Sequence, residues 1–439
     1  VEDFAIRFRK DPVSNGRIKN RFTGMTAYGE CPIDGSTLGT DWKYLSRADF
    51  AGTRTIGAVR SPANSELVKY SSYYYDAYNY SAMPVTGTDG GLRLVTKSDG
   101  SYVSKKEFDG GGSGMELVYN DALKQTLGDP ANWKDPVWSQ FLDQLTPDEL
   151  RAFVEDGGYG TRSVESIGKP QWLDYDGPSG FNNTNLAPNV KGSKMTALPA
   201  ENLVAQTWNK DLVLQAGQII GMDGQNFGLA GIYAPGINLH REYLNGRNYE
   251  YYSEDPILSG YLAASFCLGA KSNGVYCFAK HLALFDSSPL GYERAWCTEQ
   301  NLRENYLKPF EIAIKKGGAT GVMVSFNNMG ATWTGANKEL LDGILRTEFG
   351  FKGMFVTDFD MGNEACWDLR KGVRAGLNTQ LNPAYGNADK YGRLDMSNAT
   401  DVNLARESAK SIVYAYCNTY RFAKSDALKT EYSVEIAGP

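Results

Sequence analysis

The feature that most constrains the fold is an alternation of short apolar runs with helical patterns, which begins near residue 136. The apolar runs show no polar alternation, so strands buried on both faces are expected. The runs that predict strands are residues 231–239, 275–284, 321–328 and 354–356. Strands that alternate with helices through short connections are typical of parallel βα units wound in a right-handed sense.

The helical patterns between these runs carry their own start and stop signals. Thr146 is a plausible N-cap for a helix at 145–156, with Pro147 in its first turn and Glu149 completing a capping box. Other helices are predicted at 209–228, 257–274, 302–313, 337–349 and 368–376. About 300 residues of such units favour a closed α/β fold, a TIM-type (β/α)8 barrel, over an open sheet. No strand is followed by GxGxxG or GxxxxGK, so a dinucleotide or P-loop site has no support.

This pattern divides the chain into three parts. Residues 1–135 form an irregular Tyr- and Gly-rich extension, 136–425 the barrel and 426–439 a C-terminal tail. The extension contains the tyrosine-rich run 70–84 and the hinge-like DGGGSG at 109–114. Those tyrosines could stack on sugar rings, but the favoured interpretation is that they hold an extended segment against a neighbouring domain.

Composition excludes several classes of protein. A net charge of −6 and a pI near 5.3 argue against a nucleic-acid partner, and no apolar stretch is long enough for a membrane partner. The six cysteines form no zinc pattern and only two histidines occur, so we expect neither a metal site nor a cofactor. The chain opens on Val1 with no signal peptide pattern, which indicates a processed product or a fragment. We expect a cytoplasmic location, with secretion as the alternative.

Charged residues stand where the predicted strands end. Asp358 follows the run at 354–356, and parallel α/β sheets bind ligands at this end of their strands. The other candidates are Asp176, Arg247, Lys280 and His281. Any one of them alone is better explained as a helix cap, an internal ion pair or a satisfied core histidine. Two acids and three bases on one rim instead indicate a polyhydroxylated ligand, whose hydroxyls accept and donate charge-assisted bonds.

Five motifs together resemble glycoside hydrolase family 3 of the β-glucosidase type. They are DGPSG, NGRNYEYYSEDP, AKH, RENYLKPFEIAIKKGGATGVMVSFN and GMFVTDFD, and the resemblance covers about residues 140–425. Members of this family combine a barrel with an α/β sandwich and a fibronectin-like domain, and in permuted members these domains precede the barrel. The segment from residue 20 to 53 is similar to the link that joins the upstream domains to the barrel in permuted members.

The resemblance implies a role for each strand-end residue. Asp358 would be the nucleophile that forms a covalent glycosyl-enzyme, in a double displacement that retains configuration. The terminal sugar would be bound by Asp176, Arg247, Lys280 and His281, with Met323 in the wall. The substrate would be a β-glucoside or oligosaccharide, cut from its non-reducing end. We expect nearby Lys and Arg to keep the pKa of Asp358 low, because a nucleophilic carboxylate must stay ionised.

Some positions depart from the family pattern. Phe359 and Phe326 stand where Trp and Tyr are usual, and Asn378 stands where Asp is common. The general acid/base of the family is usually a Glu on the sandwich domain, and no segment here is long or regular enough to be that domain. We therefore expect the acid/base from a second polypeptide or a missing segment that docks on the barrel.

Three functions remain open at this point. The first is a retaining exo-acting β-glycosidase whose acid/base comes from outside the chain. The second is a sugar-binding barrel without turnover, which the residues Phe326 and Phe359 allow. The third is an aldolase that forms a Schiff base on Lys280, which a strand-end lysine permits but the flanking motifs do not explain.

Overall fold

The computed structural model describes most of the chain after residue 114 and three short pieces before it. The described residues are 20–22, 95–96, 102–103, 115–117, 120–182, 195–286, 294–330, 332–359, 368–381 and 393–419. The tyrosine-rich run, the DGGGSG hinge and the tail at 426–439 lie outside these residues, so the predictions made for them stay predictions.

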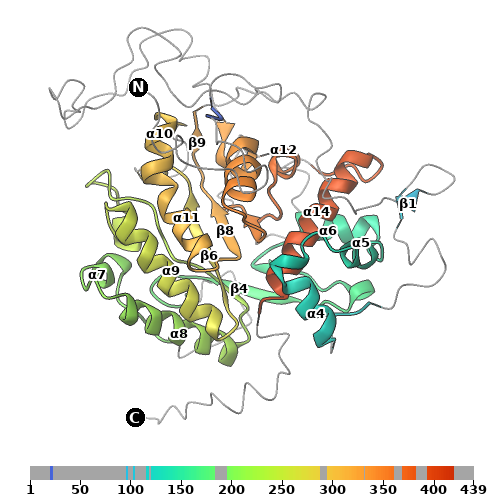
Figure 1. Ribbon diagram of the computed structural model, residues 1–439, viewed down its shortest axis with the longest axis horizontal. Coiled ribbons are helices and arrows are strands. Elements are labelled where there is room, and N and C mark those ends of the chain that lie inside the picture. The colour runs from blue at the N-terminus through green and yellow to red at the C-terminus, as the bar shows by residue number, and fades with distance from the viewer. Residues whose placement is uncertain are drawn as a thin grey trace, which may run out of the picture.

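A mixed, mainly parallel sheet forms the centre of the molecule, with strand order β11-β8-β6-β5-β4-β3 (Figure 1). Its strands are β3 (Gly160–Thr161), β4 (Trp172–Asp176), β5 (Gly231–Tyr233), β6 (Tyr276–Leu282), β8 (Gly321–Val324) and β11 (Met354–Val356). Neighbours from β4 to β11 pair in parallel, and β3 alone pairs antiparallel, with β4. All residues of β5, β6, β8 and β11 are buried, as predicted from their apolar runs.

Helices connect successive parallel strands, as the alternation predicts. The helices are α4 (Asp121–Gly128), α5 (Val137–Leu142), α6 (Pro147–Glu155), α7 (Glu201–Ala205), α8 (Lys210–Phe227), α9 (Pro256–Ser272), α10 (Glu299–Asn301), α11 (Lys308–Lys315), α12 (Leu369–Ala375) and α14 (Ala399–Tyr416). Two π-helical segments, η6 (Leu302–Tyr306) and η8 (Glu339–Glu348), complete the set. Single 3-10 turns occur at η3 (Pro130–Asn132), η4 (Glu165–Ile167), η5 (Asn248–Glu250) and η7 (Thr334–Ala336). Short strands outside the central sheet are β1 (Val95–Thr96), β2 (Tyr102–Val103), β7 (Arg294–Ala295), β9 (Asn328–Met329) and β10 (Thr332–Trp333).

Local sequence signals set the ends of these elements. The capping box of α6 is present, with the Thr146 side chain accepting from the backbone of Glu149 and the Glu149 side chain accepting from Thr146. Strand β5 is shorter than the predicted 231–239, because Pro235 has no N–H to donate to a strand ladder. The chain returns to β6 further on, where Gly236 forms a bridge with Lys280. No helix in the described ranges is long and apolar enough to cross a membrane.

The sheet curls so that its two edges approach each other. Beyond β11, Thr379 forms a parallel bridge with Val356 and extends that edge. The backbone N–H of the next residue, Gln380, donates to the carbonyl of Val154 at 3.2 Å, close to the chain that leads into β3. A side-chain Cβ at Gly157 would lie 2.4 Å from the carbonyl oxygen of Gln380, so this approach requires glycine. The fold is therefore an α/β fold with a curled sheet.

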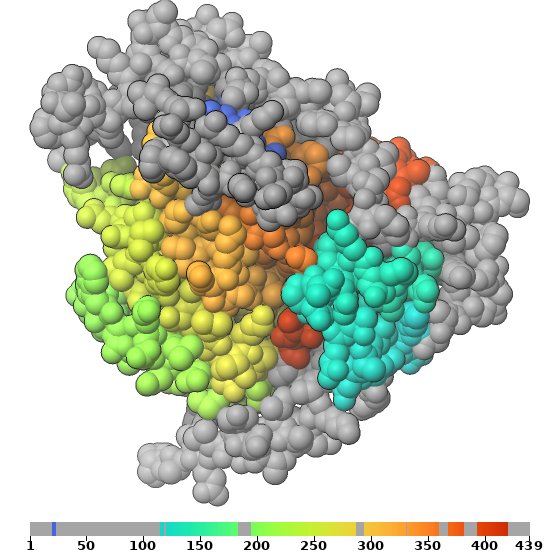
Figure 2. Space-filling view, viewed as in Figure 1, coloured from blue at the N-terminus to red at the C-terminus, as the bar shows by residue number. Residues whose placement is uncertain are grey.

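The helices that precede β4 pack against the C-terminal helix. Figures 1 and 2 show this block, coloured teal, beside the red α14. Trp172 of β4 stacks on Tyr416 of α14 with ring centroids 4.4 Å apart. Helix α4 also contacts α14, although its residues precede the expected boundary at residue 136. This helix thus belongs to the packed α/β unit and not to the irregular extension.

Candidate active site

The predicted site residues come from different strands but reach one end of the sheet. Asp176 is the last residue of β4, and Lys280 and His281 lie near the end of β6. Asp358 follows β11 by two residues, and Arg247 precedes η5 in the connection between β5 and α9. Because these strands run parallel, their C-terminal ends meet at one edge. The structure therefore brings Arg247, His281 and Asp358 into direct contact, and Lys280 joins them through Glu250.

The imidazole of His281 is the hub of these contacts. Its Nε2 lies 3.0 Å from Nη2 of Arg247 and 3.4 Å from Oδ2 of Asp358. Its Nδ1 lies 3.2 Å from the Tyr251 hydroxyl and 3.2 Å from Oδ1 of Asn238. Burial lowers the pKa of His281 well below its usual value, and Arg247 and Lys280 lower it further. The ring is therefore neutral near pH 7.

The partners of His281 also decide which ring nitrogen carries the proton. A guanidinium only donates, so Nε2 must accept from Arg247, and the proton sits on Nδ1. Nε2 then carries no hydrogen, so it offers the Asp358 carboxylate no hydrogen bond. Asn238 fixes the backbone of His281, since its Oδ1 accepts from the His281 N–H at 2.7 Å and its Nδ2 donates to the His281 carbonyl at 2.8 Å.

Glu250 joins the two cations of the site. Arg247 donates from Nε to Oε1 of Glu250, and Nζ of Lys280 lies 3.4 Å from Oε2 of the same carboxylate. Burial opposes ionisation of Glu250, but Lys280 and Arg247 outweigh it and lower the pKa. An ion-paired lysine is suited to binding hydroxyl groups. The same pairing disfavours the aldolase hypothesis, because Schiff-base formation needs Lys280 as a free amine.

Asp358 is the candidate nucleophile, and one of its oxygens is free. Oδ1 accepts from the backbone N–H of Phe359 at 2.6 Å. Oδ2 is buried and makes no hydrogen bond within the described part of the chain. Burial raises the pKa of Asp358 to about 6, although Arg247 and Lys280 act to lower it. The expectation of a low pKa for Asp358 is thus wrong, because desolvation outweighs cations that are already paired with Glu250.

This raised pKa predicts a pH dependence for any chemistry that Asp358 performs. Its folded pKa of about 6 means that the ionised, nucleophilic form is lost as the pH falls through 6. At pH 5 about a tenth of the carboxyl groups are ionised, so kcat/KM for dinitrophenyl β-glucoside should fall about tenfold from its value at pH 7. This activated substrate isolates the nucleophile, because its leaving group needs little protonation. A kcat/KM that stays flat from pH 7 to 4.5 would contradict the assignment.

Asp176 and Met323 are less directly engaged. Burial raises the pKa of Asp176, and the charges that act on it are Lys280, Glu250 and Arg247, which places it beside the cluster. Met323 is buried in β8 and pairs in register with Val356 of β11. It therefore lies in the sheet, next to a residue of β11 that comes two positions before Asp358. Its contact with a ligand stays a prediction.

Sequence reasoning missed four residues that support the cluster. Glu250, Tyr251 and Asn238 contact the predicted residues directly, and Glu201 of α7 accepts from the Gly236 N–H at 2.9 Å. Burial raises the pKa of Glu201 well above its usual value. The spacing of Glu250 three residues after Arg247 is a usable signal for an ion pair. Asn238 and Glu201 have no such local signal, because their partners are distant in sequence.

Aromatic rings form an apolar border around these charges. The Arg247 guanidinium lies 5.2 Å from the ring centroid of Phe285, which lies 5.8 Å from Phe326. The ring of Phe359 lies 6.5 Å from Tyr159. Phe326 and Phe359, the two departures from the family pattern, therefore add apolar rings to this border and no hydroxyl or indole N–H.

A cavity of about 760 Å³ lies elsewhere in the molecule. Its lining includes Trp133, Arg346, Lys352 and Asn378, and none of the predicted site residues. Lys352 precedes β11, whereas Asp358 follows it, so the cavity lies toward the opposite end of that strand. The cluster around Asp358 is the better candidate because it combines convergent charges, burial and an unpaired carboxylate oxygen.

Comparison with known proteins assigns this arrangement to a family. Residues 187–389 match the family model described as the glycosyl hydrolase family 3 N-terminal domain. The chain carries a family 3 domain. Arg247, Lys280, His281, Met323 and Asp358 lie inside the matched residues of this domain, and Asp176 lies just before them.

Relatives of the family 3 domain agree with this assignment. A β-glucosidase of Rhizobium radiobacter is 31% identical over 301 residues, which cover 67% of this chain and 36% of that protein. A β-glucosidase of Ruminococcus albus is 30% identical over 347 residues, covering 73% of this chain and 36% of that protein. Among solved structures, β-glucosidase 3B of Thermotoga neapolitana bound to glycerol superposes with a TM-score of 0.55 at 28% identity, covering 65% of this chain and 43% of that one.

The family 3 domain accounts for only part of such proteins. The chain spans between 27% and 36% of the length of the first curated relatives that it matches. What those β-glucosidases do as whole proteins is therefore a starting point for a proposal about this chain.

Proposed function

We propose that this chain is the catalytic barrel of a retaining exo-acting β-glucosidase, which removes terminal β-D-glucosyl residues. The observation that carries the proposal is the buried, unpaired Oδ2 of Asp358, 3.4 Å from His281 at the C-terminal end of a parallel sheet. The names of the relatives support a β-glucoside as substrate. The approach of the two sheet edges supports closure to a TIM-type (β/α)8 barrel.

In the first step, Oδ2 of Asp358 attacks the anomeric carbon of the terminal sugar. A bond forms between this oxygen and the carbon while the bond to the leaving oxygen breaks, through an oxocarbenium-like transition state. Positive charge develops on the sugar ring, and the carboxylate stabilises it. His281 aids this step by staying neutral, because an imidazolium 3.4 Å from Asp358 would draw electron density from the nucleophile.

In the second step, water replaces Asp358 on the anomeric carbon and restores the free carboxylate. A general acid must first protonate the leaving oxygen, and the same group then takes a proton from the water. Glu250 does not suit this role, because Lys280 and Arg247 hold it ionised. We propose that the acid/base comes from a second polypeptide, or another segment, that carries an α/β sandwich domain.

The remaining charges bind the sugar hydroxyls. Lys280 is a buried donor, Arg247 is a half-buried donor, and Asp176 is an acceptor beside them. Their mutual pairing through Glu250 fixes the donor positions before the ligand arrives, which reduces the entropy cost of binding. Met323 would contribute to the apolar wall.

Covalent trapping tests the proposal. A 2-fluoro β-glucoside with an activated leaving group should label the chain once, on the peptide that contains Asp358, and mass spectrometry locates the adduct. A label on another residue would contradict the role of Asp358. Binding of glucose with neither turnover nor label would instead favour the second candidate, a sugar-binding barrel, which the rings of Phe326 and Phe359 at the site border allow.

Replacement of Asp176 by Ala tests the sugar contacts separately. A charged hydrogen bond to a buried hydroxyl contributes about 1.5–3 kcal/mol, so kcat/KM for dinitrophenyl glucoside should fall about 10- to 150-fold. Asp148→Ala is a suitable control, because this aspartate is exposed in the first turn of α6 and its ion pair with Arg151 is local to that helix. If Asp176→Ala leaves kcat/KM within about threefold of the parent, Asp176 is not a sugar ligand.

A further inference from the structure

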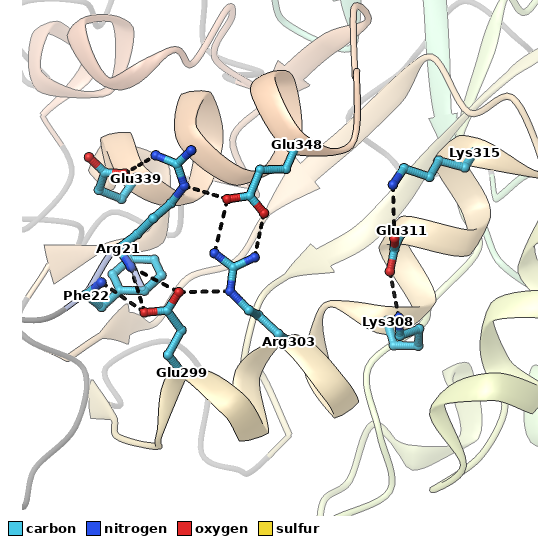
Figure 3. Close-up of polar contacts among 9 residues, drawn as sticks. All are labelled: Arg21, Phe22, Glu299, Arg303, Lys308, Glu311, Lys315, Glu339 and Glu348. Atoms are coloured by element: carbon cyan, nitrogen blue, oxygen red, sulfur yellow. Dashed lines mark hydrogen bonds and ion pairs between the residues drawn. The ribbon is translucent and has the colours of Figure 1, made fainter. Parts of the chain in front are cut away.

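A cluster of carboxylates and guanidinium groups lies on helices outside the proposed active site (Figure 3). The carboxylates are Glu299 of α10 and Glu339 and Glu348 of η8, and the guanidinium groups belong to Arg303 of η6 and to Arg21. Arg21 lies 278 residues before Glu299 in the chain, so the cluster ties residues 20–22 to a distant part of the α/β unit.

Residues 20–22 make more contacts here than a surface ion pair would. Nε of Arg21 donates to Glu348 at 2.6 Å, and Nη1 donates to Glu339 at 2.7 Å. The backbone N–H groups of Arg21 and Phe22 both donate to Oε2 of Glu299, at 2.8 and 3.1 Å. The Phe22 side chain is 5% exposed and joins the hydrophobic core. The α/β unit therefore binds the Arg21 side chain, the backbone N–H groups of both residues and the ring of Phe22.

Within the α/β unit, the buried carboxylates Glu299 and Glu348 share the guanidinium of Arg303. Arg303 donates to both oxygens of Glu348, at 2.6 and 3.2 Å, and to Glu299 at 2.8 Å. Glu299, Glu348 and Arg303 are at most 9% exposed. Without Arg21, the guanidinium of Arg303 would have to neutralise both buried carboxylates, Glu299 and Glu348. Leaving a buried charge without its partner is strongly unfavourable, so the cluster is complete only when residues 20–22 are in place.

The shape of η8 also fits an arginine. A Cβ atom at Gly343 would lie 2.8 Å from Nη1 of Arg21 and 2.7 Å from Oε2 of Glu339. Glycine in the interior of a helix costs about 0.5–1 kcal/mol relative to alanine. Glycine at this position therefore lowers the stability of the helix, but it leaves the space that the Arg21 guanidinium occupies.

We propose that Glu299, Glu339 and Glu348 form a docking site for an arginine–aromatic segment, which Arg21 and Phe22 occupy, and that this site fixes where the upstream polypeptide joins the α/β unit. The ligand class is an extended peptide that offers a guanidinium, two consecutive backbone N–H groups and an aromatic ring. The site lies outside the set of residues proposed to act on sugar, so its role is anchoring and not catalysis.

Arg21→Ala in the full chain tests the proposal. Removing one partner of this buried network should lower Tm at pH 8 by at least about 5 °C. Hydrogen exchange at the amides of residues 21 and 22 should become at least about tenfold faster, because these N–H groups lose their hydrogen bonds to Glu299. Lys315→Ala is the matched control, since it breaks a 3.0 Å ion pair with Glu311 that is local to α11 and half-exposed. That variant should stay within about 1 °C of the parent.

The pH dependence separates charge from packing. The charged groups that face Glu299 are Arg303 on η6, Glu339 and Glu348 on η8, and Arg21. Burial raises the pKa of Glu299, whereas the backbone N–H groups of Arg21 and Phe22 act to lower it, so detachment of this segment in Arg21→Ala would raise it further. A carboxyl with a raised folded pKa stabilises the fold less as the pH rises through that value. The Tm loss of Arg21→Ala should therefore be larger at pH 8 than at pH 5.

Gly343→Ala provides a second variant that removes no charge. Alanine favours the helix, so a lower Tm together with faster exchange at residues 21 and 22 assigns the effect to displacement of the guanidinium. Equal Tm losses at pH 5 and 8 for Arg21→Ala would overturn the proposal, because they indicate lost packing alone. Unchanged exchange at residues 21 and 22 in both variants would also overturn it.

Discussion

Asp358→Asn is expected to lose hydrolysis by about 10³- to 10⁵-fold while the protein stays folded. The amide keeps the shape of the side chain and can still accept from the Phe359 N–H, but it cannot form a glycosyl ester. Turnover of dinitrophenyl β-glucoside measures the loss. Asp148→Asn, on the exposed surface of α6, is the matched control and should retain activity within about twofold.

The same variant is expected to be more stable than the parent above pH 6. The folded pKa of Asp358 is about 6, whereas an aspartate in an unfolded chain has a pKa near 3.9. The parent therefore loses stability as the pH rises through this range, by an amount on the order of 2–3 kcal/mol. Asparagine does not ionise, so Asp358→Asn avoids this loss. Near-normal turnover, or a Tm at pH 8 well below that of the parent, would contradict the position that we assign to Asp358.

The second large effect concerns the leaving group. If the general acid/base lies outside this chain, the purified chain should hydrolyse dinitrophenyl β-glucoside weakly and cellobiose hardly at all. A dinitrophenolate leaves without protonation, whereas a sugar oxygen needs a proton as it departs. General acid catalysis typically accelerates a reaction by about 10²–10⁴-fold. The ratio of the cellobiose rate to the dinitrophenyl glucoside rate should therefore be lower by about this factor for the purified chain than for a complete enzyme.

Addition of the partner is the decisive half of this experiment. A polypeptide that supplies the acid/base should restore cellobiose hydrolysis and change the rate on dinitrophenyl glucoside much less. Mass spectrometry must first show that the purified chain is free of a second polypeptide. If that chain cleaves cellobiose at a normal enzymatic rate, the acid is within the chain. Glu201→Gln and Asp176→Asn would then identify it, since both carboxyl groups have raised pKa values beside Lys280.

Much of the fold could be predicted because its signals are local. The capping box at Thr146 and Glu149 needs only neighbouring residues, and it is present as predicted. The buried strands β6, β8 and β11 lie where continuous apolar runs occur. Asp358 could be identified as a candidate because a residue that follows a parallel strand must lie at one edge of the sheet, whatever the rest of the chain does.

The contacts that define the chemistry depend on packing between distant segments. Asn238 lies 43 residues from His281 in the chain, and the contact of its Oδ1 with Nδ1 of the ring agrees with the tautomer that Arg247 imposes at Nε2. Sequence reasoning expected the cations to lower the pKa of Asp358. The structure reverses that sign, because Glu250 already pairs with the cations and burial then dominates.

Neighbouring residues suffice to predict the order of strands and helices, their caps and the strand end at which Asp358 stands. These follow from periodicity and hydrogen bonding within a few residues. The protonation of the site and the contact of Arg21 with Glu299 are set by long-range packing instead. Both depend on how much water is excluded and on which charges approach within a few ångströms, and those quantities exist only after segments hundreds of residues apart have packed together.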